Sequence, residues 1–293
     1  MTGATGLVGV EICKELTIRG HTVVGLSRGR RSVKSGNLED WALDLKDLDK
    51  LSAWSEGRRC DAIVHAASEI DLAPYGQSLI ASNCLGTLNT IWLAEKWKVE
   101  KLVYISSVQV LGSSPKSMVD ETSMPNPYTT YHATKLFGES VVSAASERGI
   151  DSISLRISAP IGLNMPKHRF LSALFHKASR GEAIELLGIG TRRQDYVDTR
   201  DVGAAVVQSL TPGKSGLFHI ASGIPKSNLE LAELVNGLFG NRSEIVLGKR
   251  KIPDDSISWE ISIEKARRDL AWTPSHTLSD TLNLIRNSTR SIW

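Results

Sequence analysis

The sequence has little cysteine, no long hydrophobic run and almost no net charge. Its three cysteines, Cys13, Cys60 and Cys84, are scattered among apolar residues, which favours reduced core thiols over a disulfide framework. No run reaches the length of a membrane span, and Glu11 and Lys14 interrupt any secretory signal. A net charge of +3 is too small to indicate nucleic acid or an acidic membrane surface as a partner. We therefore expect a soluble, cytoplasmic protein.

Metal binding is not expected either, because histidine and cysteine never occur at metal-ligand spacing. The chain has 293 residues, of which 41% are hydrophobic and 23% charged, an ordinary globular composition. That length suits one large domain or a domain with a smaller lobe.

Three glycines, Gly3, Gly6 and Gly9, recur at three-residue intervals just before a predicted helix at 10–19. Glycine permits a tight turn and lets a phosphate approach the N–H groups at a helix start, where the helix dipole favours negative charge. The next element is a predicted buried strand at 21–26, followed by Ser27 and Arg28. In dinucleotide folds an acid at this point binds the ribose of NAD, whereas an arginine suits the 2′-phosphate of NADP.

NADP is therefore favoured over NAD. The alternative is that Arg28, Arg30 and Arg31 form only a solvated loop. Met1 and Thr2 alone precede Gly3, although such a glycine turn normally follows a central first strand. The first strand is apparently truncated. If the chain begins at Met1, we expect an open core, an unsupported loop, weak cofactor binding and poor stability.

A candidate acid/base pair lies on a predicted helix that begins near Tyr131. Tyr131 and Lys135 are four residues apart and share one helix face. The ammonium favours the phenolate and is expected to lower a pKa that is normally about 10. The spacing alone is a weak signal. Ser107 ends a predicted strand at 101–107, and ligands collect at the carboxyl ends of parallel strands.

The remaining pattern alternates strands and helices. Further strands are predicted at 41–45, 61–67, 151–157 and 216–220, and further helices at 47–56, 78–98, 170–180, 199–210, 227–239, 263–270 and 278–286.

Taken together, this order resembles the extended short-chain dehydrogenase/reductase family, in its nucleotide-sugar epimerase/dehydratase branch, over essentially the whole chain. The glycine triad is similar to the family's cofactor loop, and Tyr131 and Lys135 to its Tyr-x-x-x-Lys pair. Residues 106–112 resemble its Ser-Ser-x-x-Val-Tyr-Gly run, and residues 195–202 and 265–274 resemble its "RDFVxVxDV" and "KARRELGWxP" segments.

The resemblance implies an α/β fold, a doubly wound parallel Rossmann sheet with a smaller C-terminal substrate lobe. The dinucleotide domain is expected at 1–157 plus about 190–220, and the lobe at 158–189 plus 221–293. Ser107, Tyr131 and Lys135 are the implied catalytic residues. The implied cofactor contacts are Gly3, Thr5, Gly6, Leu7, Gly9, Ser27, Arg28, Asp44, Leu45, Ala66, Ala67, Asn83, Tyr131, Lys135 and Ser158. Homodimers of the family pair the helices that correspond to 78–98 and 131–148.

Departures from the family pattern narrow the choice of reaction type. Its dehydratases carry Thr-Asp-Glu where Ser107 is followed by Val108 and Gln109, so dehydration is not expected. Gln194 replaces the family arginine for the substrate diphosphate; Arg192 or Arg193, besides Ser107, is expected to contact substrate.

The expected function is epimerisation or reduction at a hydroxyl or ketone carbon of a nucleotide-linked sugar, with NADP or NAD. An NADPH-dependent reductase of a non-sugar carbonyl and a non-catalytic NAD(P)-binding regulatory protein remain as alternatives.

Overall fold

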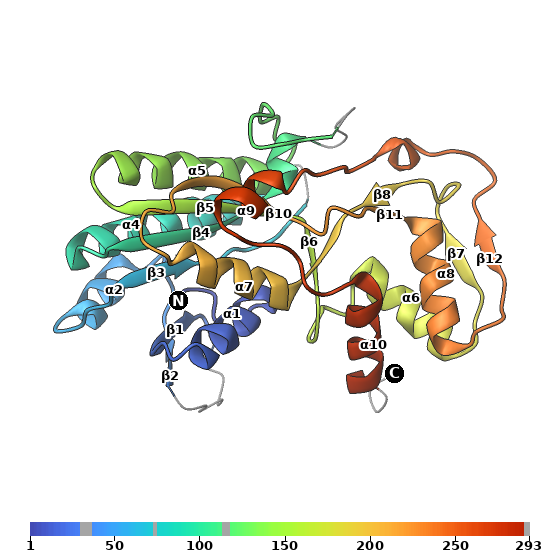
Figure 1. Ribbon diagram of the computed structural model, residues 1–293, viewed down its shortest axis with the longest axis horizontal. Helices are drawn as coiled ribbons and strands as arrows, with labels where there is room; N and C mark the ends of the chain where they lie inside the picture. Colours follow the sequence, from blue (N-terminus) through green and yellow to red (C-terminus); the bar gives the residue numbers. More distant parts are fainter. Residues whose placement is uncertain (30–36, 73–74, 113–117, 290–293) are drawn as a thin grey trace.

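A parallel β-sheet forms the centre of the computed structural model, which describes residues 1–29, 37–72, 75–112 and 118–289 (Figure 1). Arg30 and Arg31 lie outside these residues. In spatial order the strands are β2 (Leu38–Ala42), β1 (Val23–Ser27), β3 (Ala62–His65), β4 (Lys101–Ser107), β5 (Asp151–Ile157) and β10 (Gly216–Ile220). Every pairing is parallel, as expected for a doubly wound fold.

The first strand is reduced to the residues around Thr2, which lie between β1 and β3. Thr2 forms parallel bridges with Leu26 on one side and His65 on the other. Its amide donates to the Val64 carbonyl over 2.9 Å, and the Gly3 amide donates to the Leu26 carbonyl over 2.8 Å. The expectation of an unsupported glycine loop is therefore wrong, because this short pairing holds the loop at the centre of the sheet.

Helices cover both faces of the sheet (Figure 1). One face carries α4 (Gly86–Trp97) and α5 (Thr130–Glu147). The other carries α1 (Leu7–Ile18) and α7 (Thr199–Ser209), which pack against each other. Strands β3 and β4 contribute to two hydrophobic clusters, Val64, Val103 and Ile105 to one and Ile63, Leu102 and Tyr104 to the other. Helix α2 (Leu48–Ser55) and the short α9 (Glu264–Asp269) complete this part of the molecule.

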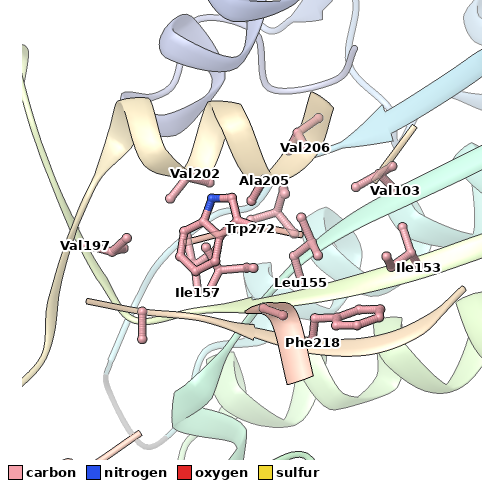
Figure 2. Close-up of a cluster of buried hydrophobic side chains, with 14 of the residues drawn as sticks. Val103, Ile153, Leu155, Ile157, Val197, Val202, Ala205, Val206, Phe218 and Trp272 are labelled. Atoms are coloured by element: carbon pink, nitrogen blue, oxygen red, sulfur yellow. The ribbon is translucent and has the colours of Figure 1, made fainter. Parts of the chain in front are cut away.

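Trp272 fills the core between α7 and the sheet (Figure 2). It packs with Val202 of α7 and Leu155 of β5, and its indole N–H donates to the Asp201 carbonyl over 3.0 Å. The "KARRELGWxP"-like segment thus returns to the part of the molecule that contains the large sheet and closes its core.

A second group of elements forms a smaller lobe beyond the carboxyl ends of the strands (Figure 1). Its helices are α6 (Phe170–Ser179), α8 (Asn228–Phe239) and α10 (Leu278–Thr289), and its strands are β7 (Ile184–Leu186) and β12 (Ile245–Leu247). They share a separate hydrophobic cluster. Short pairs connect this lobe to the sheet: β6 (Ala159–Ile161) with β9 (Tyr196–Asp198), and β8 (Arg193–Gln194) with β11 (Lys226–Ser227).

Two predicted elements differ in detail. The strand predicted at 41–45 lies at Leu38–Ala42, because the five residues of β1 pair from Leu38 onward. The helix predicted at 78–98 begins with α3 (Gln77–Leu79) and passes through a π-helical segment, Ile80–Leu85, before α4. Within the described residues, no helix combines the length and the hydropathy needed to cross a bilayer.

Candidate active site

The glycine turn before α1 lies tightly against the neighbouring backbone. Gly3 has a φ of +68°, and a Cβ there would lie 2.7 Å from the Ala67 amide nitrogen, so glycine is required. A Cβ on Gly9 would overlap the Gly3 carbonyl oxygen, so α1 lies directly against the turn. The helix begins after Gly6 without a side-chain cap and without an acid in its first turn. Its first N–H groups and the positive end of its dipole therefore suit an anion.

A cleft of about 1060 Å³ runs from this turn, past the ends of β3, β4 and β5, to α6 in the lobe. Of the predicted site residues it is lined by Gly3, Gly6, Leu7, Gly9, Ala66, Ser107, Tyr131, Lys135, Ser158 and Arg192. The predicted residues outside its lining are Thr5, Ser27, Arg28, Asp44, Leu45, Ala67, Asn83 and Arg193. The three predicted catalytic side chains and the glycine turn thus share one cavity.

Helix α5 presents Tyr131 and Lys135 to this cleft. Thr129 caps the helix, its hydroxyl accepting from the His132 amide over 3.3 Å. The Lys135 ammonium donates to the Ile105 carbonyl of β4 over 2.8 Å. Its Nζ lies 5.9 Å from the centre of the Tyr131 ring. Both side chains are more than nine-tenths buried, Tyr131 being 8% and Lys135 3% exposed.

Burial dominates the protonation of both groups. It raises the pKa of Tyr131 to about 12, against smaller lowering effects of Arg169 and of a hydrogen bond from Ser68. It lowers the pKa of Lys135 to about 8, which Glu139 partly offsets. The shift of Tyr131 is opposite to the direction expected from its spacing to Lys135. The sequence pattern carries no measure of desolvation, which outweighs neighbouring charge here.

Ser107 occupies the carboxyl end of β4, where the strand passes into the 3₁₀ turn η2 (Val108–Leu111). Its hydroxyl accepts from the Gln109 amide over 3.2 Å, which orients Oγ at the floor of the cleft. Gln109 also lines the cleft, and its Oε1 lies 3.0 Å from Nε2 of His132. No carboxylate stands at either position that follows Ser107.

Two cleft residues near the Tyr131 phenol, Ser68 and Arg169, belong to none of the sequence motifs. Ser68, just after β3, supplies the hydrogen bond to Tyr131. Arg169, the N-cap residue of α6, is half-buried in the cleft and lowers the pKa of Tyr131 by its charge. Burial lowers the pKa of Arg169 itself, and Tyr131 raises it. Because Arg169 comes from the lobe, only the folded chain brings it to α5.

The predicted adenosine contacts lie at the other end of the glycine turn. The Ser27 hydroxyl donates to the Gly29 carbonyl, and Arg28 pairs with Glu69 at 3.5 Å. The Arg28 side chain is 65% exposed. Asp44 accepts from the Lys46 amide over 3.0 Å. Leu45 is buried, and Thr5 is half-buried within the turn.

Asn83 ties together three parts of the site from within the π-helical segment. Its amide nitrogen donates to the Glu69 carbonyl and to the Thr134 hydroxyl, each over 3.0 Å, and its oxygen accepts from the Glu69 amide over 2.8 Å. It is 3% exposed. The Ala67 amide similarly donates to the Thr2 hydroxyl over 3.2 Å. In this structure both predicted cofactor contacts brace the backbone around the cleft.

The two candidate substrate arginines point to different places. Arg192 lines the cleft near Tyr196, whose phenol pKa burial raises to about 12 and Arg192 lowers. Arg193 instead pairs with Glu230 at 3.5 Å and donates to the Pro225 carbonyl over 3.0 Å. Ser158 lines the cleft and donates to the buried Asp195 over 2.6 Å.

The sheet is doubly wound, and one cleft joins its central glycine turn to a buried phenol, ammonium and hydroxyl. This is the arrangement of the short-chain dehydrogenase/reductases. Within that class the chain belongs to the NAD dependent epimerase/dehydratase family, whose sequence model matches residues 1–221. The resemblance found in the motifs is thereby confirmed.

Individual relatives span the whole chain at low identity. The chain is 27% identical over 316 residues to the UDP-glucose 4-epimerase of Mycolicibacterium smegmatis, which covers 99% of both proteins. The solved UDP-glucose 4-epimerase of Thermotoga maritima, with UDP-glucose, superposes with a TM-score of 0.90 at 22% identity, over 99% of this chain and 97% of that one. The Thermus thermophilus UDP-glucose 4-epimerase, in complex with NAD, gives 0.88 at 22% identity, over 100% and 98%. These two structures establish the fold.

Proposed function

We propose that the protein transfers hydride at a hydroxyl or ketone carbon of a nucleotide-linked sugar, as an epimerase first and as a reductase second. The observation that carries the proposal is that Ser107, Tyr131 and Lys135 line the same cleft as the glycine turn. The epimerase reading is supported by relatives that are UDP-glucose 4-epimerases. The reductase reading is supported by Arg28 beyond β1, which suits an exchangeable NADPH.

Each polar group has a chemical role in this proposal. Tyr131 exchanges a proton with the sugar hydroxyl or ketone, and Ser107 holds the reacting oxygen by a hydrogen bond. Lys135 supplies the positive charge one turn away and binds the nicotinamide ribose. When bound, the nicotinamide ring supplies the hydride chemistry, which the protein orients. Burial keeps Tyr131 protonated at neutral pH, so the phenolate depends on added positive charge.

The residues of the glycine turn fit a dinucleotide. Gly3, Gly6 and Gly9 would hold its diphosphate against α1, and Ala66 would lie beneath the nicotinamide half. Arg28 would bind a 2′-phosphate, which supports NADP; the NAD in a related structure supports the alternative. Glu69 beside Arg28 weighs against a second anion there.

The substrate side has cations suited to a nucleotide diphosphate and a sugar. Arg192 replaces the family arginine missing at Gln194, and Arg169 lies beside the reacting phenol. The absence of an acid at Val108 and Gln109 argues against water elimination. The same loss of the family arginine supports, as a second candidate, a reductase of a non-sugar carbonyl.

Pairing of two chains through α4 and α5 is part of the proposal. The helical stretch from α3 to α4 exposes Ile80, Leu85 and Leu88, which are 53%, 42% and 44% accessible. Such a group of apolar side chains on one helical layer suits burial against a second copy.

A panel of UDP-, dTDP- and GDP-sugars, with and without added NADPH or NADH, tests the proposal. Turnover without added cofactor identifies an epimerase, and stoichiometric cofactor oxidation identifies a reductase. Oxidation of NADPH by a simple ketone alone identifies the non-sugar reductase. Tight dinucleotide binding without any turnover would replace the enzyme by a non-catalytic binding protein.

A further inference from the structure

A buried ion pair lies beneath the catalytic turn of α5. Arg156 of β5 donates to both carboxylate oxygens of Glu139, with Nε–Oε1 and Nη2–Oε2 distances of 2.9 and 2.8 Å. The Ser106 hydroxyl of β4 donates to the same Oε1 over 2.5 Å. The Arg156 and Glu139 side chains are 3% and 9% exposed. One carboxylate therefore joins α5 to two neighbouring strands.

The residues of this ion pair lie next to the strand and helix positions that line the cleft. Ser106 and Arg156 are partners across β4 and β5, one residue before the strand ends at the cleft. On α5, Tyr131, Lys135 and Glu139 follow one another at four-residue intervals, so they share a face. The ion pair thus fastens the same side of the helix that presents the phenol and the ammonium.

Lys135 has few charged neighbours. The ionisable groups that face it are Tyr131 and Glu139 on α5, Tyr104 on β4 and His65 on β3. Burial lowers the pKa of His65 to about 3 and raises that of Tyr131 to about 12, so both are neutral near pH 8. Burial also raises the pKa of Tyr104. Among these described groups, Glu139 carries the charge that raises the pKa of Lys135, and Arg156 is the partner of that carboxylate.

We propose that Glu139 is a positioning residue, which holds the catalytic turn of α5 on β4 and β5 and keeps the Lys135 ammonium charged at neutral pH. Arg156 and Ser106 in turn fix the position of the Glu139 carboxylate by three hydrogen bonds. The catalytic meaning rests on the proposed function, because a charged Lys135 is what favours the Tyr131 phenolate. The electrostatic effect itself needs neither cofactor nor substrate.

Three variants separate charge from stability. Glu139→Gln removes the carboxylate charge and keeps an oxygen that accepts from Ser106. Arg156→Gln removes the partner and keeps the carboxylate. Each leaves one buried charge unpaired and is expected to destabilise the fold, whereas the double variant leaves none and recovers part of the loss. Glu147→Gln, at the exposed end of α5, is the matched control.

The readout is the titration of Lys135, followed by NMR of protein labelled with ¹³C at lysine Cε and assigned with Lys135→Arg. We expect Glu139→Gln and the double variant to lower its midpoint by about one pH unit. Arg156→Gln and the control should not lower it. An unchanged midpoint in Glu139→Gln, or shifts that follow the order of stability instead of the charge at residue 139, would overturn the inference. If the wild-type protein shows no turnover, the proposed function is overturned and the electrostatic role of Glu139 is not.

Discussion

The Lys135 ammonium lies 5.9 Å from the centre of the Tyr131 ring, on the same face of α5. The ammonium donates its hydrogen bond to the Ile105 carbonyl, whereas Arg169 and Ser68 lower the pKa of the Tyr131 phenol. Both groups are buried, and desolvation disfavours the charged form of each. Burial therefore keeps the phenol neutral at neutral pH and makes the Lys135 ammonium easier to deprotonate.

Replacing Tyr131 by phenylalanine should remove turnover and leave dinucleotide binding intact. The phenol exchanges the proton in the proposed reaction, and general acid/base catalysis contributes roughly 10²–10⁴-fold. Steady-state rates on the responsive sugar nucleotide and dinucleotide affinity by fluorescence measure the two effects. Tyr75→Phe is the control, because Tyr75 is 92% exposed. A fully active Tyr131→Phe protein would exclude the assigned role.

Replacing Lys135 by methionine should stabilise the protein at neutral pH. Burial lowers the pKa of Lys135 from 10.5 to about 8, so between these values the unfolded chain binds more protons than the folded one. The contribution of Lys135 to the free energy of unfolding therefore rises with pH across that window. The free energy of unfolding of the variant should exceed that of the parent by about 3 kcal/mol at pH 7. This difference should shrink as the pH approaches 10. Urea unfolding at both pH values measures this; a pH-independent difference contradicts it.

Arg28 should decide the choice of cofactor. We expect the protein to bind NADPH more tightly than NADH. Arg28→Gln should weaken the binding of NADPH by about tenfold and leave the binding of NADH unchanged. Because Glu69 lies 3.5 Å from Arg28, Glu69→Gln should strengthen NADPH binding. Titration by fluorescence or calorimetry provides the affinities, with Arg19→Gln, at the far end of α1, as control. Tighter NADH binding in the parent protein would reverse the assignment to NADP.

The exposed leucines of α4 and the preceding π-helical segment should mediate self-association. Light scattering is expected to show a dimer, and Leu88→Glu to produce a monomer by placing a charge at the contact. Ile18→Glu, at a residue 75% exposed on α1, should leave the mass unchanged. A monomeric parent, or a dimer insensitive to Leu88, would remove this surface from the proposal.

Most elements of the fold could be predicted because buried strands give a local apolar pattern. The pattern is continuous at 102–105 in β4 and alternating at Ile153, Leu155 and Ile157 in β5. The prediction placed β2 three residues too far along the chain. The strand is partly exposed and carries Glu39 and Asp40, which weaken its apolar pattern. Leu43 and Leu45, beyond its end, supplied the misleading apolar pattern.

The site residues likewise divide into those that local sequence predicts and those that only the folded chain reveals. Motif spacing placed Ser107, Tyr131 and Lys135 because strand ends and helix periodicity are local properties. Arg169 has no such spacing, since the lobe carries it to Tyr131 across the fold. Burial decides the direction of the Tyr131 shift, and burial depends on the whole molecule.

The bridge at Thr2 makes the sheet unequal in strength. Strands β4 and β5 pair over seven residues, whereas the bridges of Thr2 to Leu26 and His65 connect β1 and β2 to the rest. Amide hydrogens of β1 and β2 should therefore exchange earlier than those of β4 and β5. In the proposed function, the adenosine of a dinucleotide would rest on β1 and β2, where exchange is expected earlier, whereas Ser107 ends β4.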